Sequence, residues 1–244
     1  MTQVSPEPYL EKVLPGLIPT AAPQPNVCLS CRSGTDPETS RCKQCSRLGV
    51  PRILPISMST HGGLLHTHLR RYKDGSEQQR STFTLRLAAL LSLFVTNHLD
   101  CVGRGYDAVV TAPSARRDAM QTIVRKVRRL HKVHVALEFI GTDQLTSYAA
   151  PPSLYAKRVV LLDDTFTSGQ TITAAHNALT NAGVDVLSCV VIGRHFRPDY
   201  SSNRFLAHCL KRRTWHLEHC GKCKPVNCHS GSQRHSGSQQ LRLH

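Results

Sequence analysis

The chain has 244 residues, which fits one good-sized domain or one domain with a small accessory module. Apolar residues make up 40% of it, enough for a core, and segments rich in Val, Leu and Ile exclude disorder along the whole chain. The 31 Lys and Arg against 16 Asp and Glu give a net charge of +15, which suggests an anionic partner such as nucleic acid or a polyphosphate metabolite. A basic protein without such a partner is the plainer alternative.

The sequence predicts neither a membrane segment nor a secretion signal. No window approaches the ~18 consecutive apolar residues of a spanning helix. Residues 1–12 place acidic residues and Pro ahead of any apolar run, unlike a signal peptide. We therefore expect a cytoplasmic protein with no membrane partner. In a reducing compartment, paired Cys residues are more often metal ligands than disulfides.

Four regions are expected along the chain. Residues 1–27 are Pro-rich and predict an extended N-terminal segment. Residues 28–50 are dense in Cys, Gly and Ser and predict a small loop-rich module. Residues 51–215 would form the main domain. Residues 216–244 are rich in Cys and His, end in Ser-Gly-Ser-Gln repeats, and predict a disordered tail.

Within the main domain, apolar runs alternate with helical periodicities. Strands are predicted at 52–57, 107–112, 133–140, 158–162 and 184–193, and helices at 64–73, 78–98, 116–131, 170–181 and 200–213. The first strand contains Pro55 and is therefore expected at an edge of the sheet. This alternation predicts an α/β fold with a parallel sheet that binds ligands at the carboxyl ends of its strands.

The most informative stretch is residues 159–171, VVLLDDTFTSGQT. A buried strand leads into two acidic residues, a turn with hydroxyl groups and one Gly, and a helix start. Backbone N–H groups of such a turn and of a helix N-terminus form an anion site. Asp163 and Asp164 suit sugar hydroxyls or the waters around a divalent cation. The alternative is that one Asp caps the turn and the other is solvated.

Other nucleotide motifs fit poorly. The chain has no Gly-x-x-x-x-Gly-Lys-Ser/Thr loop, and Gly103-x-Gly105 does not lie between a strand and a helix. Residues 159–171 instead resemble the phosphoribosyl pyrophosphate (PRPP) motif of type I phosphoribosyltransferases. The resemblance implies that Asp163 and Asp164 hold the ribose 2- and 3-hydroxyls. It implies that the 5-phosphate is held by Thr165, Phe166, Thr167, Ser168, Gly169, Gln170 and Thr171.

Two regular Cys-x-x-Cys pairs lie in the N-terminal module. Cys28 and Cys31 form the first pair, and Cys42 and Cys45 follow after ten intervening residues. Four thiolates at this spacing can close a tetrahedral zinc site in a module too small to have its own core. Unrelated thiols would not produce two such pairs, so we expect structural zinc here.

A four-Cys zinc module ahead of a PRPP motif resembles the ComF family of competence-associated, phosphoribosyltransferase-like proteins. Residues 71–75, residues 106–110 and Pro113 match the family's order of segments, and the resemblance covers residues 28–195. It implies a type I phosphoribosyltransferase-like sheet flanked by helices. Two segments depart from the pattern: residues 114–121 lack the family's Gly and Asn, and residues 142–157 are short where catalytic transferases have a lid.

The implied activity is transfer of a phosphoribosyl group from PRPP to an acceptor, with release of pyrophosphate and with Mg²⁺ accompanying PRPP. Ser114, Arg116 and Arg117 are candidate pyrophosphate contacts, because the planar Arg fork binds phosphate through two hydrogen bonds. A solvated basic helix start is the alternative. Lys73 and Glu138 are weak candidates for a base, and the acceptor is not readable from the sequence.

A second functional hypothesis is a non-catalytic protein that retains the PRPP pocket and binds nucleic acid in DNA uptake or processing, as the resemblance implies. The basic residues between 125 and 132 could contact phosphates, or could simply be a solvated helix face over a buried Val124, Val127 and Leu130.

Further Cys residues lie outside the four-Cys module. Cys220 and Cys223, with Cys228 and His residues nearby, could bind a second zinc or lie in an unstructured thiol-rich tail. Cys101, Cys189 and Cys209 are expected to be buried apolar residues, as free Cys usually is.

Overall fold

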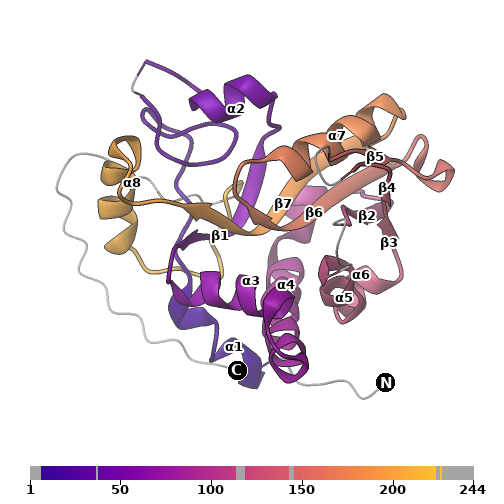
Figure 1. Ribbon diagram of the computed structural model, residues 1–244, viewed down its shortest axis with the longest axis horizontal. Helices are drawn as coiled ribbons and strands as arrows, with labels where there is room; N and C mark the ends of the chain where they lie inside the picture. The colour runs from indigo at the N-terminus through magenta and orange to yellow at the C-terminus, as the bar shows by residue number, and fades with distance from the viewer. Residues whose placement is uncertain (1–6, 37, 114–118, 143–145, 224–225, 227–244) are drawn as a thin grey trace.

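The computed structural model describes residues 7–36, 38–113, 119–142, 146–223 and 226. At its centre lies a parallel sheet with the strand order β1-β7-β6-β2-β3 (Figure 1). These strands are β1 (Ile53–Thr60), β7 (Asp185–Phe196), β6 (Arg158–Phe166), β2 (Ala108–Thr111) and β3 (His134–Ala136). Every neighbouring pair is parallel. The predicted α/β fold class is therefore confirmed, and β1, with its Pro55, lies at an edge as expected.

Helices cover both faces of the sheet. Figure 1 shows α3–α6 on one side and α2 and α7 on the other. The helices are α1 (Glu7–Leu10), α2 (Lys43–Leu48), α3 (Leu64–Asp74), α4 (Glu77–Gly103), α5 (Ala119–Arg125), α6 (Arg128–His131), α7 (Gln170–Asn181) and α8 (Ser201–Lys211). Short 3-10 turns span Leu14–Gly16 and Pro152–Leu154, and β4 (Glu138–Phe139) pairs antiparallel with β5 (Tyr148–Ala149).

Two predicted elements are divided in the structure. The helix expected at 116–131 appears over its described part as α5 and α6, because Val127 has an extended backbone (φ −96°, ψ 104°). The strand expected at 133–140 divides into β3 and β4. In both places apolar side chains continue to face the core across the break, so the hydrophobic pattern alone did not reveal it.

Alternate side chains of the central strands enter two separate cores. Val160 and Leu162 pack with α3–α6, whereas Val159 and Leu161 pack with α7 and the four-Cys module. Both sets are at most 3% exposed. A parallel strand covered on both faces has no polar side, which explains the continuous apolar run of the sequence.

The strand order reverses between β2 and β6. β3 lies beyond β2 on one side, and β7 lies beyond β6 on the other. The helices that follow these two strands, α5 and α7, pack into different cores on the two faces of the sheet. Ligands of open α/β sheets bind at this switch point.

The two ends of the chain pack more closely than expected. Residues 7–27 include α1, and Val13 is completely buried in the main core. In the tail, residues 216–223 are described and continue from Trp215, whose indole N–H donates to the carbonyl of Ile56 at 3.0 Å. Val226 donates its backbone N–H to Thr20 at 3.2 Å. This part of the tail is folded rather than disordered, and residues 227–244 lie outside the described residues.

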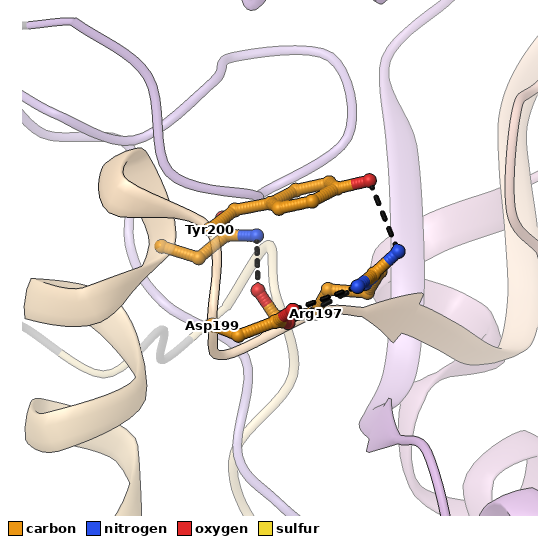
Figure 2. Close-up of polar contacts among 4 residues, drawn as sticks. Arg197, Asp199 and Tyr200 are labelled. Carbon is orange, nitrogen blue, oxygen red and sulfur yellow. Dashed lines mark hydrogen bonds and ion pairs between the residues drawn. The ribbon is translucent and has the colours of Figure 1, made fainter.

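The turn between β7 and α8 carries an exposed polar cluster, which Figure 2 shows. Arg197 Nη2 lies 2.7 Å from Asp199 Oδ2, and its guanidinium lies 4.6 Å from the centre of the Tyr200 ring. The ion pair holds the pKa of Asp199 below its ordinary value. Both charged side chains are more than half exposed, so the pair contributes little to stability.

Among the described residues, α4 is the one helix long and apolar enough to cross a membrane by length and composition. Polar residues interrupt its apolar residues, so a search for uninterrupted apolar runs misses it. Of its most apolar window, 56% is buried inside the protein. Leu87, Leu90 and Leu91 are fully buried against the sheet, which is typical of a core helix.

Candidate functional site

A cavity of about 510 Å³ opens where the strand order reverses. α3, α5 and the ends of β2, β6 and β7 contribute to its walls. Its lining includes Lys73, Ala112, Asp163, Asp164, Thr165 and Thr167. The sheet topology and the observed cavity therefore identify the same place, and it is where residues 159–171 predicted an anion site.

The two acidic side chains at the end of β6 are both buried. Asp163 is 9% exposed and Asp164 is 5% exposed. Asp163 Oδ1 accepts the backbone N–H of Asp164 at 2.8 Å. Asp164 is paired with Lys73, whose Nζ lies 2.7 Å from Oδ2 and 2.8 Å from Oδ1. The alternative with a solvated Asp therefore does not describe this site, although Asp163 does accept a backbone hydrogen bond.

Burial sets the electrostatics of these groups. It raises the pKa of Asp163 against the charge of Lys73, and it raises the pKa of Asp164 to about 7 against hydrogen bonds from Thr165. Burial also lowers the pKa of Lys73. Two desolvated carboxylates facing a cavity are costly unless something in the cavity donates hydrogen bonds to them.

The loop after the acids wraps the cavity and ends at the N-terminus of α7. Thr165, Thr167 and Thr171 line the cavity. Gly169 precedes the helix with φ +89°, and a Cβ there would lie 2.8 Å from Phe166 Cζ. This position therefore requires glycine.

The other predicted loop residues, Phe166, Ser168 and Gln170, do not line the cavity. Phe166 is 2% exposed. Ser168 accepts the side-chain amide of Gln44 through its carbonyl at 3.4 Å. Gln170, the first residue of α7, has its backbone N–H 3.5 Å from Ser168 Oγ.

Arg194 joins this loop to the four-Cys module. Its guanidinium stacks 4.6 Å from the centre of the Phe166 ring and donates to the carbonyls of Phe166 and Thr167 at 3.3 and 3.4 Å. It also donates to the carbonyl of Cys31 at 3.1 Å and to Ser33 Oγ at 2.6 Å. Sequence analysis missed this residue because the contacts span 161 and 163 positions.

The four predicted zinc ligands lie together. The sulfur atoms of Cys28, Cys31, Cys42 and Cys45 are all within 4.8 Å of one another. The Cys31–Cys42 separation is 3.8 Å, which matches the ~3.8 Å edge of a tetrahedron with Zn–S bonds of ~2.3 Å. Hydrogen bonds from the other three Cys hold the pKa of Cys31 well below its ordinary value. This cluster could therefore hold a metal such as zinc.

The remaining Cys residues divide into three cases. Cys189 is buried, as expected, at 2% exposure. Cys209 is disulfide-bonded rather than free. Cys101, expected to be an apolar core residue, instead lies 3.6 Å from Cys220 in a cluster with His98 and Cys223. The His98-x-x-Cys101 spacing, one helical turn, was the available signal for this cluster.

A group of three histidines at the cavity edge also escaped sequence analysis. The ring nitrogens of His61, His66 and His195 lie within 4.8 Å of one another, so these side chains could hold a metal ion. His66 and His195 line the cavity. Burial, followed by neighbouring His and Arg charges, lowers the pKa of both. The imidazoles of His66 and His195 therefore lose their proton at a lower pH than an ordinary histidine does.

The predicted pyrophosphate contacts and the two candidate bases lie in different places. Ser114, Arg116 and Arg117 lie outside the described residues. Glu138 is exposed on β4 and does not line the cavity. Lys73 does line it, but as the partner of Asp164.

Comparison with known proteins adds little to this geometry. No protein-family model and no curated protein match the chain. Among solved structures, a purine phosphoribosyltransferase from Pyrococcus horikoshii Ot3 has a TM-score of 0.30 and 15% identity, covering 48% of this chain and 88% of its own. A hypothetical protein from Neisseria gonorrhoeae with bound ppGpp has a TM-score of 0.29 and 13% identity, covering 52% of this chain and 92% of its own. Likeness at this level identifies no family, so the function rests on the site itself.

Proposed function

We propose that the cavity binds PRPP and that the protein transfers the phosphoribosyl group to an acceptor with release of pyrophosphate. One observation carries this proposal: two buried acids at the end of β6 are followed directly by a glycine-containing loop and the N-terminus of α7, at the switch point of the sheet. Sugar hydroxyls suit the acids, and a phosphate suits the loop. PRPP carries both on one ribose, the hydroxyls on C2 and C3 and the phosphate on the exocyclic C5.

In this proposal the chain's residues bind and orient the ligand. Asp163 and Asp164 accept hydrogen bonds from the ribose 2- and 3-hydroxyls. Backbone N–H groups of residues 165–171 and the threonine hydroxyls donate to the 5-phosphate, aided by the positive end of the α7 dipole. Gly169 gives the loop its positive-φ turn into α7, where a side chain would collide with Phe166.

The reaction breaks the bond from ribose C1 to pyrophosphate, whose oxygen keeps the electron pair. The acceptor forms a new bond to C1 and gives up a proton. The protein's contribution is positioning and neutralisation of charge. Lys73 is in place as a cation, and we also propose Ser114, Arg116 and Arg117 as pyrophosphate contacts. Mg²⁺, when bound with PRPP, would neutralise pyrophosphate charge.

We further propose that the chain is a ComF-type protein. Its order of a four-Cys module followed by a parallel α/β domain supports this. The proposed domains are 1–27, 28–50, 51–215 and 216–244. Zinc is the proposed metal of the four-Cys module, because four thiolates are a structural zinc set. A cytoplasmic location is proposed because Cys28, Cys31, Cys42 and Cys45 form no disulfide.

Calorimetry of PRPP binding with Mg²⁺ tests the proposal. Wild type should bind, and Asp163→Asn/Asp164→Asn should lose detectable binding while remaining folded. Asp199→Asn, which removes an exposed carboxylate in the cluster of Figure 2, is the matched control and should bind like wild type. Absence of binding to wild type would refute the proposal. Pyrophosphate release with base or amine acceptors then tests for turnover.

The exposed basic residues favour a second candidate, nucleic-acid binding without catalysis. Arg125, Lys126, Arg128, Arg129 and Lys132 are all exposed on and around α5 and α6, over a buried Val124, Val127 and Leu130. Such a surface would contact phosphates without reading base sequence. Salt-sensitive DNA binding together with PRPP binding but no turnover would favour this candidate.

A further inference from the structure

A second thiol cluster lies on the opposite side of the sheet from the four-Cys module. His98 and Cys101 come from one turn of α4, and Cys220 and Cys223 come from the segment after α8. Their four potential ligand atoms lie within 4.8 Å of one another. Cys220 packs into the core shared by α3–α6, whereas Cys28, Cys31 and Cys45 pack into the core on the other face.

Three of four separations within the cluster are close to those of a tetrahedral zinc site. Bond lengths of ~2.3 Å to sulfur and ~2.05 Å to nitrogen give edges of about 3.8 Å between sulfurs and about 3.6 Å between sulfur and nitrogen. Cys101 Sγ lies 3.6 Å from Cys220 Sγ. His98 Nδ1 lies 3.6 Å from Cys223 Sγ and 3.9 Å from Cys101 Sγ. The Cys220–Cys223 pair, at 3.1 Å, must open slightly.

A hydrogen bond fixes the imidazole in the form that a metal requires. His98 Nε2 lies 2.5 Å from the carbonyl oxygen of Leu217, an atom that can only accept. Nε2 therefore carries the proton, and Nδ1 presents its lone pair to the three sulfurs. Metal-bound histidines are oriented by this kind of contact to a backbone carbonyl.

The turn at Cys220 is shaped for a thiolate. The backbone N–H groups of Lys222 and Cys223 donate to Cys220 Sγ at 3.4 and 3.3 Å. The four-Cys module contains the same kind of contact, from the N–H of Cys42 to Cys28 Sγ at 3.3 Å. Such bonds stabilise negative charge on sulfur.

We infer that His98, Cys101, Cys220 and Cys223 form a second, structural zinc site that fastens the C-terminal segment to α4. Three thiolates and one imidazole leave no open position, as in structural rather than catalytic zinc sites, and soft thiolates disfavour Mg²⁺. The ligands are separated by 119 positions between Cys101 and Cys220. A metal bound here would therefore close a long loop of the chain.

The segment that this site holds covers the edge of the sheet. At Gly221 an added Cβ would lie 3.5 Å from Leu54 and 3.6 Å from Thr20, so the chain runs closely over β1 and the N-terminal segment. Trp215, the single Trp of the chain, lies at the start of this segment. Loss of metal should therefore release the C-terminal segment and change the fluorescence of Trp215.

Metal counting tests the site without reference to PRPP. Protein purified under reducing conditions without chelator should contain about two zinc ions per chain. Cys220→Ser/Cys223→Ser should contain about one, and proteolysis after residue 213 should become faster. Cys189→Ala, which removes a buried thiol outside both clusters, is the control and should retain both ions. Cys223→His supplies another zinc ligand and should retain the second ion, which Cys223→Ala should lose.

Three results would overturn the inference. The first is a single zinc in wild type that Cys220→Ser/Cys223→Ser retains. The second is a Cys220–Cys223 disulfide in the reduced preparation. The third is loss of the second ion from Cys223→Ala and Cys223→His alike in protein whose circular dichroism is unchanged, since a ligand role predicts rescue by histidine.

Discussion

Replacing Asp164 by Asn should make the protein more stable at pH 8 and no more stable at acid pH. Burial raises the pKa of this carboxyl from 3.8 to about 7. A raised acid pKa means that stability present at low pH is lost as the pH rises through about 7. Asn is neutral throughout and is nearly isosteric with a protonated Asp. The variant therefore removes a penalty that wild type begins to bear when the unfolded chain ionises this carboxyl, above about pH 3.8, and bears in full above about pH 7.

The magnitude follows from the same shift. From pH 5 to pH 7, two pH units, the free-energy penalty of burying this carboxyl grows by about 3 kcal/mol, at ~1.4 kcal/mol per unit. The variant also loses the ion pair with Lys73, which reduces its gain in stability. That loss is limited, because the Lys73 side chain is 38% exposed and can return to water. We expect the stability difference between variant and wild type to rise by about 1–3 kcal/mol from pH 5 to pH 8.

Urea unfolding at both pH values, followed by Trp215 fluorescence and circular dichroism, measures this difference. Contributions from histidines and thiols are common to both proteins and cancel in the comparison. Asp199→Asn, at a carboxylate whose side chain is 62% exposed, should show no such pH dependence. Parallel pH profiles for Asp164→Asn and wild type would refute the reasoning, because they would mean that Asp164 is ionised without penalty.

Two further predictions concern the loop and the basic surface. Gly169→Ala should destabilise the protein by roughly 1–2 kcal/mol, because φ at this position is +89° and the added Cβ meets Phe166. The free energy of PRPP binding should fall by more than the free energy of unfolding does. Calorimetry measures the first and urea unfolding the second, and wild-type values in both would contradict the prediction. Arg128→Glu/Arg129→Glu should leave PRPP binding unchanged. If the basic surface binds DNA, it should reduce the salt dependence of DNA binding by about one unit of log–log slope per lost phosphate contact.

The sequence was most informative where the site is contiguous. Residues 158–171 contain an apolar strand, the acids and the loop in one run, so their local order could be read directly. α7 begins at Gln170 and ends at Asn181, as predicted, because Gly169 and Gly183 mark its ends with positive φ angles. A parallel sheet followed from the alternation of such strands with helices.

The rest of the site depends on contacts between distant residues. The Lys73–Asp164 pair spans 91 positions, and no local pattern relates the two. The histidine group joins the start of α3 to the end of β7, and the His98–Cys101 turn becomes a site only when the C-terminal segment packs against α4. The break at Val127 was hidden for a related reason: Val124, Val127 and Leu130 remain buried on both sides of it.

The two thiol clusters should differ in their effect on ligand binding, because only the four-Cys module is joined through Arg194 to the loop at residues 165–169. Arg194 donates to Cys31 on one side and to Phe166 and Thr167 on the other, so the four-Cys module holds the loop in shape. Disrupting that module should lower PRPP affinity about tenfold or more, the equivalent of one lost charged hydrogen bond. Arg194→Lys, which keeps the charge but not the planar fork, should do the same while zinc remains bound. Removal of Cys220 and Cys223 should leave PRPP affinity near wild type, since these residues contact His98 and Cys101 of α4 and do not line the cavity. Equal loss of PRPP affinity from both clusters in folded protein would mean that metal acts through global stability and not through Arg194.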